Sequence, residues 1–175
     1  MALLPILLTS AHAAQYRALM LQAYADCPDA FTSSVADRTG LALGWWKQRL
    51  SGAPDANERV WGVAAGDALA GVVGLSFDKR EKVRHKAHLF GMFVTPEFRQ
   101  RGLGGELLAA ALQHARTQAQ VQIVQLTVTQ GNRSAQALYE RHGFVEFGLE
   151  PFAVAVAGGF VAKSHMWCRL GWSAG

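Results

Sequence analysis

The stretch that decides the fold is residues 94–105, with the sequence VTPEFRQRGLGG. It follows a hydrophobic run and precedes an amphipathic one, so it predicts a loop between a strand and a helix. The loop combines small residues, two arginines (Arg99 and Arg101) and the free backbone N–H groups of a helix N-terminus. These are the components of a phosphate-binding site. The stretch therefore predicts a site for a phosphorylated cofactor.

Two better-known glycine patterns do not fit this loop. A dinucleotide fingerprint counted from Gly102 would need a sixth-place glycine, and that place holds Leu107. A Walker loop would end in Gly-Lys-Ser/Thr, whereas this chain continues Gly-Glu-Leu. The pattern that does fit is Arg-x-x-Gly-x-Gly, formed by Arg99, Gly102 and Gly104. Taken alone, the loop is also compatible with a plain structural turn.

A second motif lies at residues 132–144, with the sequence NRSAQALYERHGF. Asn132 is a favourable helix N-cap and Gly143 is a favourable left-handed residue after a helix, so a helix is predicted between them. Four residues recur at the spacing of one helix face: Ala135, Leu138, Tyr139 and His142.

The two motifs, in this order, resemble the acyl-CoA site of the GNAT N-acetyltransferases. The resemblance is strong over residues 86–149 and general outside them. It implies an α/β fold, with a mixed, mostly antiparallel central sheet of about seven strands flanked by four helices. It also implies transfer of the acetyl group of acetyl-CoA to a primary amine of a small molecule or peptide.

The resemblance further implies which residues contact acetyl-CoA. The backbone of Met92, Phe93 and Val94 would pair with the pantetheine arm, where two central strands separate after a bulge. The pyrophosphate would lie over the N–H groups of one run: Gln100, Arg101, Gly102, Leu103, Gly104 and Gly105. Gly102 and Gly104 would allow its close approach, because neither has a Cβ. Arg99 and Arg101 would add charge-assisted hydrogen bonds; without an anion, cations there oppose the helix dipole.

Tyr139 is the predicted catalytic residue. A CoA thiolate that leaves a thioester needs a proton, and a tyrosine hydroxyl is a suitable general acid. The alternative interpretation of Tyr139 is a core aromatic on the buried face of a helix. Asn132 is predicted to cap its helix and to contact the cofactor.

The general base is less defined. Residues 87–94 and 121–128 contain no Asp or Glu, so His88 is the nearest titratable candidate. A purely structural histidine and a water relay without a dedicated base are the alternatives. His85 and His88 would point to opposite faces of a strand, so no metal site is predicted.

The resemblance also implies that the acceptor is recognised by the first two helices and by the connection between the last two strands. That connection, residues 151–160, reads PFAVAVAGGF and offers no acid to pair with an ammonium group. It suggests a small or neutral-bodied acceptor. Trp45 and Trp46 are interpreted as core residues.

Composition sets broader limits. The chain has 175 residues, of which 50% are hydrophobic and 17% are charged, so a single globular domain over residues 1–175 is expected. Its net charge of +4 suits an anionic cofactor but not a nucleic-acid surface. The basic run at residues 79–86 is interpreted as an exposed turn. Cys27 and Cys168 lack CxxC spacing, so a reduced, cytoplasmic protein without a structural metal is expected.

The remaining elements follow from periodicity. Residues 2–8 with Ala11-His12-Ala13 imitate a secretory signal, but no Lys or Arg precedes them, and residues 3–9 are predicted to form the first strand instead. No apolar run is long enough to span a membrane.

Helices are predicted at residues 10–25 and 37–50, and strands at 60–65, 69–77, 87–94, 121–128, 144–149 and 165–170. The strand at 87–94 is apolar almost throughout, which predicts burial on both faces.

Two functional classes stay open from sequence alone. The favoured class is direct acetyl transfer, because neither cysteine lies in a nucleophile context. The alternative is a catalytically silent acyl-CoA-binding regulatory module. The lack of an Asp or Glu in residues 87–94 and 121–128 favours it, and the Tyr139 motif opposes it. A homodimer formed by edge-strand pairing is compatible with the chain. The acceptor itself is not determined by the sequence.

Overall fold

The apolar segments of the chain join in one seven-stranded sheet in the computed structural model, which describes residues 3–171. Its strand order is β1-β2-β3-β4-β5-β7-β6, and every neighbouring pair is antiparallel except the parallel pair β4–β5. The strands are β1 (Pro5–Leu7), β2 (Glu58–Ala65), β3 (Ala68–Phe77), β4 (Lys86–Val94), β5 (Ile123–Thr129), β6 (Val145–Val156) and β7 (Gly159–Arg169). The predicted mixed, mostly antiparallel sheet is confirmed.

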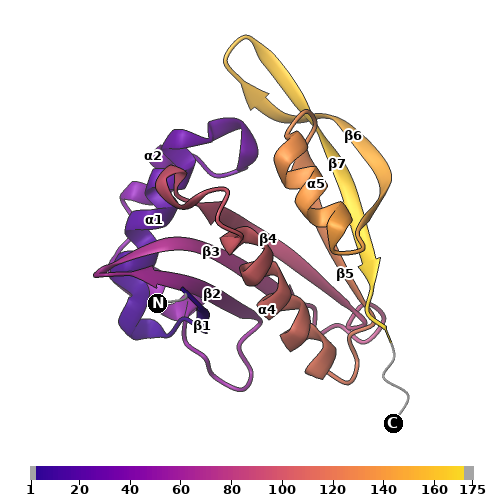
Figure 1. Ribbon diagram of the computed structural model, residues 1–175, viewed down its shortest axis with the longest axis horizontal. Helices are drawn as coiled ribbons and strands as arrows, with labels where there is room; N and C mark the ends of the chain where they lie inside the picture. The colour runs from indigo at the N-terminus through magenta and orange to yellow at the C-terminus, as the bar shows by residue number, and fades with distance from the viewer. Residues whose placement is uncertain (1–2, 172–175) are drawn as a thin grey trace.

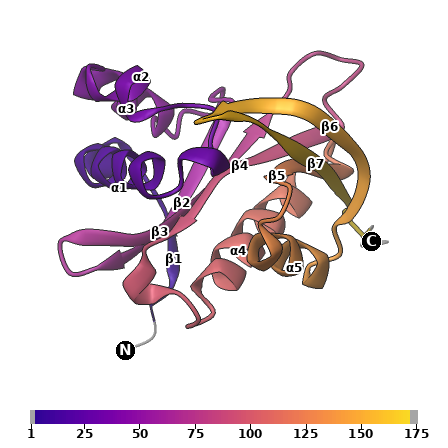
Figure 2. The same ribbon diagram turned by 90° about the horizontal axis from the view of Figure 1, so that it is seen from above.

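The helices cover both faces of the sheet (Figure 2). One face carries α1 (Ala13–Asp26), α2 (Val35–Thr39) and α3 (Leu43–Arg49), and the other carries α4 (Leu103–Thr117) and α5 (Arg133–Arg141). Short 3-10 turns precede or join them: η1 (Ser10–His12), η2 (Pro28–Ala30) and η3 (Pro96–Phe98).

The helix predicted over residues 37–50 is instead two helices, α2 and α3. Ser34 caps α2 by accepting a hydrogen bond from the backbone of Asp37 (3.2 Å), and Gly40 ends the helix. A new helix then starts after Ala42, which has an extended backbone. Glycine is a poor residue for a helix interior, so the break falls where helix propensity is weakest.

The strand buried on both faces is β3, not β4 as predicted. In β3, Val72 packs in the α1-side core, while its neighbour Val73 packs in the α4-side core. In β4, by contrast, His88 is exposed and Met92 is only partly buried. The reason is position: β3 is paired along most of its length with β2 on one side and with β4 on the other, whereas β4 pairs with β5 along only its first three residues, 86–88.

Other local predictions are confirmed. The turn at Gly66 and Asp67 joins β2 and β3, with Gly66 in the left-handed region at φ +62°. The basic run before β4 is an exposed turn. In α4 the apolar face is buried as expected, through Leu103, Leu107, Leu108, Ala111 and Ala115.

The predicted loop at residues 151–160 is wrong. The last two strands continue through it and form a long hairpin that turns at Ala157 and Gly158 and projects beyond α5 (Figure 1). Gly158 has a φ of +84°, which suits a tight turn. Small and apolar residues therefore extend the strands here instead of forming an irregular connection.

Three further findings bear on function. Within residues 3–171, no helix combines the length and apolar character needed to cross a membrane. The same residues contain no group of three or more His, Cys, Asp or Glu side chains placed to hold a metal ion. Cys27 and Cys168 are both free thiols.

Candidate active site

The site begins where β4 and β5 separate. The two parallel strands pair at Lys86–Ile123, Ala87–Val124 and His88–Gln125, and their register ends there. Both strands nevertheless continue, β4 to Val94 and β5 to Thr129. Beyond residue 88, β4 stays paired with β3 and β5 with β7, but the edges of β4 and β5 that face each other have no strand partner. Ligands bind at such carboxyl ends in open α/β sheets.

A β-bulge in β4 lies just beyond this separation. Val72 of β3 is paired with Phe93, but Gly74 is paired with Phe90, so Gly91 and Met92 together face a single residue. Gly91 adopts φ +64°, a left-handed conformation that only glycine adopts readily. The extra residue reverses the alternation of side chains: Leu89 belongs to the α4-side core and Phe93 to the α1-side core.

The glycine loop follows directly. Gln100 and Gly102 are left-handed, at φ +59° and +82°, and Gly102 is the N-cap of α4. No side chain caps this helix, and Glu106 makes its first intrahelical bond, to the carbonyl of Gly102 (3.1 Å). The first-turn N–H groups of the helix are therefore available to an anion.

The glycines of the loop have different roles. Gly102 permits the left-handed turn into α4. At Gly104, a Cβ would lie 3.2 Å from the Leu138 side chain on α5, so this glycine allows the two helices to pack closely. The missing Cβ of Gly104 thus has a packing role as well; both glycines line the cavity next to the loop, and close approach of the cofactor to them stays a prediction.

The two arginines of the loop also differ. Arg99 donates from Nε to the carbonyl of Val94 (3.0 Å), and its guanidinium lies 5.7 Å from the centre of the Phe93 ring. Arg101 turns instead toward Phe98, 5.2 Å from that ring. Only Arg99 lines the cavity next to the loop.

That cavity, here called the loop cavity, has a volume of about 510 Å³. It lies between the loop, the bulged end of β4 and the face of α5, and Cys27 and Phe31 reach it from the α1 side. The predicted cofactor residues that line it are Met92, Phe93, Val94, Arg99, Gln100, Gly102, Leu103, Gly104, Gly105 and Asn132. Arg141, which sequence reasoning missed, adds a second cation from the last turn of α5.

Asn132 has the predicted capping role. Its side-chain oxygen accepts a hydrogen bond from the backbone N–H of Ala135 (3.3 Å) at the start of α5. Asn132 and Ala135 also line a second, smaller cavity of about 230 Å³, here called the tyrosine cavity. The two cavities share Ala30, Phe31 and Met92 as well, so they are adjacent.

Tyr139 lines the tyrosine cavity. Its side chain is buried, 5% exposed, and its ring meets Phe144 edge-on with 5.8 Å between centroids. Burial raises the pKa of Tyr139 to about 12. The ring packing supports the interpretation of Tyr139 as a core aromatic. The proton-donor interpretation is compatible with its place in the cavity, because no described residue forms a hydrogen bond with its hydroxyl.

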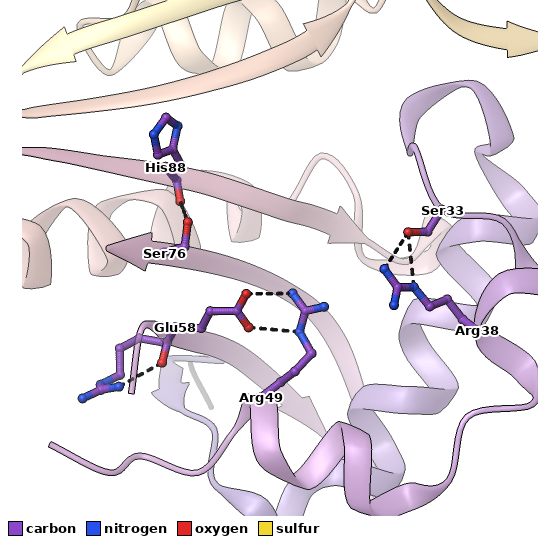
Figure 3. Close-up of polar contacts among 7 residues, drawn as sticks. Ser33, Arg38, Arg49, Glu58, Ser76 and His88 are labelled. Atoms are coloured by element: carbon purple, nitrogen blue, oxygen red, sulfur yellow. Dashed lines mark hydrogen bonds and ion pairs between the residues drawn. The ribbon is translucent and has the colours of Figure 1, made fainter. Parts of the chain in front are cut away.

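His88 is not brought to the same place. It is exposed and borders a separate surface depression with Ser76, Asp78 and Arg80. Its carbonyl accepts a hydrogen bond from Ser76 Oγ at 3.4 Å (Figure 3). Partial burial and the nearby Lys86 lower the pKa of His88. It lines neither of the two adjacent cavities, so a role as general base has no geometric support.

The α1 side supplies one wall of the tyrosine cavity through Phe31. Its ring packs edge-on against Tyr24, with 5.3 Å between centroids. Arg38 donates two hydrogen bonds to Ser33 Oγ (2.9 and 3.2 Å), which hold the segment after Phe31 against α2 (Figure 3). The position of Phe31 is therefore fixed by two contacts within residues 24–38, one made by Tyr24 and one by Arg38.

A second wall is Phe90 of β4. The Arg49 guanidinium lies 5.2 Å from the Phe90 ring centre and pairs with Glu58 of β2, with nitrogen–oxygen distances of 3.1 and 3.2 Å (Figure 3). The ion pair neutralises Arg49 and ties α3 to the sheet. Arg49 therefore packs against the Phe90 ring while its charge is balanced by Glu58.

Sequence reasoning also missed Lys163. It lies on β7, lines the tyrosine cavity and is buried. The expected loop at residues 151–160 placed the last strand at residue 165, so Lys163 was left outside it. The signal that could have found it is the antiparallel pairing of Lys163 with Thr129 and Glu150, which is a property of the sheet.

The chain is similar to known proteins in both sequence and fold. A model of the acetyltransferase (GNAT) family matches residues 18–144. A GNAT-family acetyltransferase from Streptococcus pneumoniae is similar over 97% of this chain and 100% of its own, with a TM-score of 0.87 and 26% identity. A ribosomal-protein-alanine N-acetyltransferase from Brucella melitensis covers 96% of this chain and 100% of its own, with a TM-score of 0.81 and 22% identity. YncA from Salmonella typhimurium, whose structure includes its cofactor acetyl-CoA, covers 100% of this chain and 98% of its own, with a TM-score of 0.79 and 17% identity.

Proposed function

Because this chain belongs to the GNAT acetyltransferase family, we propose that it transfers the acetyl group of acetyl-CoA directly to a primary amine of a small molecule or peptide. The observation that carries the proposal is the contact between two cavities. The loop cavity offers helix N–H groups and Arg99 to a pyrophosphate, and the tyrosine cavity offers an acid beside it. Acetyl-CoA bound to YncA supports the choice of donor.

The loop cavity suits the charged end of the donor. Its N–H groups belong to the first turn of α4, which also carries the positive end of the helix dipole. Arg99 and Arg141 add two positive charges, and no carboxylate lines the cavity within the described residues. The bulged edge of β4, at Met92 to Val94, can pair with an extended amide-containing chain as a strand would.

The reaction needs little of the protein beyond placement and one proton donor. The amine nitrogen attacks the thioester carbonyl carbon, the carbon–sulfur bond breaks, and CoA leaves as a thiolate. Tyr139 donates a hydrogen bond to that sulfur as negative charge develops on it, and the proton lost by the amine reaches the thiolate through solvent. The products are the N-acetyl amine and free CoA thiol.

The raised pKa of Tyr139 suits this role. Because burial raises that pKa to about 12, the hydroxyl keeps its proton throughout the neutral range. A thiol has a pKa of roughly 8.5, so the proton is held more tightly by the tyrosine than by the departing sulfur. Tyr139 therefore acts mainly by donating a strong hydrogen bond as negative charge develops.

The compartment is proposed from the cysteines. Neither Cys27 nor Cys168 is paired in a disulfide, and both are compatible with the reducing cytoplasm. Nothing in the proposed reaction uses either thiol as a nucleophile. Cys168 is buried, and burial raises its pKa to about 11, which makes it unreactive.

The test is release of CoA thiol from acetyl-CoA across a panel of amines, with the variant Tyr139→Phe. We expect turnover with at least one amine, and a kcat lowered by about 100-fold in Y139F, the range for loss of one hydrogen-bond donor to developing negative charge. The Phe ring keeps the contact with Phe144, so folding and acetyl-CoA affinity should be retained. Tyr16→Phe is the matched control, since Tyr16 is equally buried but lines neither cavity.

The alternative class is a silent acyl-CoA-binding module. It predicts no turnover with any amine, while acetyl-CoA still raises the melting temperature through binding to the folded state. That pair of results would replace the acetyltransferase proposal. An unchanged kcat in Y139F would instead remove Tyr139 from the mechanism and leave the activity in place.

A further inference from the structure

Lys163 is a charged residue in a cavity lined by apolar, aromatic and neutral polar residues. It is 8% exposed and lines the tyrosine cavity. Of the described residues that line this cavity, it alone carries a charge; most of the others are apolar or aromatic, among them Phe31, Leu89, Phe90 and Leu126. The ammonium group itself is only partly buried, so it is accessible from the cavity, and a partly desolvated cation favours an anionic partner.

The nearest acid does not supply that partner. Glu150 lies directly opposite Lys163 in the β6–β7 register. Its carboxylate instead accepts a hydrogen bond from His165 Nε2 at 2.8 Å. Within residues 3–171, no ion pair or side-chain hydrogen bond holds the Lys163 ammonium. Burial lowers the pKa of Lys163, and the nearby Glu150 opposes that change.

The location of Lys163 relative to Tyr139 gives the cation a purpose. Both residues line one cavity of about 230 Å³, which is large enough for a small ligand but not for a folded chain. The loop cavity opens next to it, so an acetyl group delivered from that side would meet the acceptor amine here. A group that pairs with Lys163 must then lie within a few bonds of that amine.

On the basis of the proposed function, we propose that the acceptor is an amine that carries a carboxylate next to it, an α-amino acid with an apolar side chain, and that Lys163 binds this carboxylate. The carboxylate supplies the counter-ion that the cavity lacks, in a charge-assisted hydrogen bond. The apolar walls at Phe31 and Phe90 contact the side chain of the amino acid. A peptide N-terminus or a protein lysine has no carboxylate at this distance and is disfavoured.

The test compares two acceptors that differ only in this group, L-methionine and L-methioninamide, in the wild-type enzyme and in Lys163→Met. We expect the variant to lose about 10- to 100-fold in kcat/KM for methionine, the range for a lost hydrogen bond to a charged group. For methioninamide we expect a change below about threefold. The ratio of the two effects cancels the difference in amine pKa between the acceptors. Lys82→Met, at an exposed turn position, is the matched control.

Each contrary outcome has its own meaning. Equal losses with both acceptors in K163M would overturn carboxylate recognition and point to a role of Lys163 in proton transfer or folding. A wild-type enzyme that prefers methioninamide and other neutral amines at saturating pH would overturn it without any variant, even if K163M fails to fold. Failure of every amine, with acetyl-CoA still bound, would reject the proposed function instead of this inference.

Discussion

The loop cavity and the tyrosine cavity lie side by side and are built in opposite ways. Most residues that line the loop cavity come from two stretches of the chain, residues 92–105 and 132–141, and Cys27, Ala30 and Phe31 complete it from the α1 side. The tyrosine cavity is formed by side chains that five separate elements bring together: η2, β4, β5, α5 and β7. Most of the loop cavity is therefore specified by residues that are close together in the chain. The tyrosine cavity forms only after the sheet has assembled.

The β4 bulge joins the two constructions. At the bulge, Gly91 and Met92 together face one residue of β3. As a result, Leu89 and Phe93 lie on opposite faces of the sheet. On one side it leaves a free strand edge beside the glycine loop. On the other it places Phe90 and Leu89 against the tyrosine cavity. One inserted residue thus shapes both halves of the site.

The largest expected effect breaks the loop cavity. Replacing Arg99 by Glu removes a cation that lines the cavity and adds a repelling charge, so the KM for acetyl-CoA should rise by about 100-fold. Replacing Arg101 by Glu, two residues away but turned toward Phe98, should raise it by about threefold, because exposed charges are screened by salt. Steady-state kinetics at fixed ionic strength measure both, and equal effects would mean that the arginines bind as a pair.

The second prediction concerns the junction, and it is a pH profile measured with a neutral amine such as methioninamide. Below the pKa of the acceptor amine, roughly 8, kcat/KM should rise about tenfold per pH unit as the free amine forms. Because burial raises the pKa of Tyr139 to about 12, its proton is retained and no descending limb should occur up to pH 10.

A falling limb centred at or below pH 10 would contradict a shielded Tyr139. An additional ionisation below pH 6.5 that disappears in His88→Ala would return His88 to the mechanism, contrary to its place outside the two cavities.

The smallest expected effect locates the boundary between the cavities. Cys27, at the end of α1, lines the loop cavity and is partly exposed, whereas Cys168 is buried and has a raised pKa of about 11. One thiol per native chain should therefore react with a maleimide. Acetyl-CoA at five times its Kd should slow that reaction by about sixfold, the occupancy factor. Methionine alone should not protect, since Cys27 does not line the tyrosine cavity.

Much of the fold was predictable because its signals are local. The apolar face of α4, the turn at Gly66 and the cap at Asn132 each depend on residues a few positions apart. Apart from the helix break at Gly40, which has a local cause, the errors lie where a segment takes its structure from a distant partner. Residues 151–160 were expected to form a loop, yet antiparallel pairing between β6 and β7 makes them strand. Burial of β4 on both faces failed for the same reason, since β5 leaves it after residue 88.

The candidate site divides along the same line. Arg99 and Arg101 were both expected to bind the pyrophosphate, but in the structure Arg99 packs against Phe93 and Arg101 turns toward Phe98. His88 was chosen because it was the nearest titratable residue along the chain, but strand position carries it to another depression. Lys163 was overlooked because its importance depends on the absence of an ion pair with Glu150, which no spacing rule reveals.

By itself, the sequence determined that residues 94–105 form a glycine loop before a helix and that residues 132–144 form a capped helix with Tyr139 on its buried face. Glycine conformations, helix termini and caps are short-range properties, so a short stretch of sequence is sufficient to specify them. Only the tertiary structure decided where β4 and β5 part, which arginine faces the cavity and that a buried lysine stands beside Tyr139. Those features arise from strand pairing and desolvation between residues far apart in the chain, and they exist only in the assembled fold.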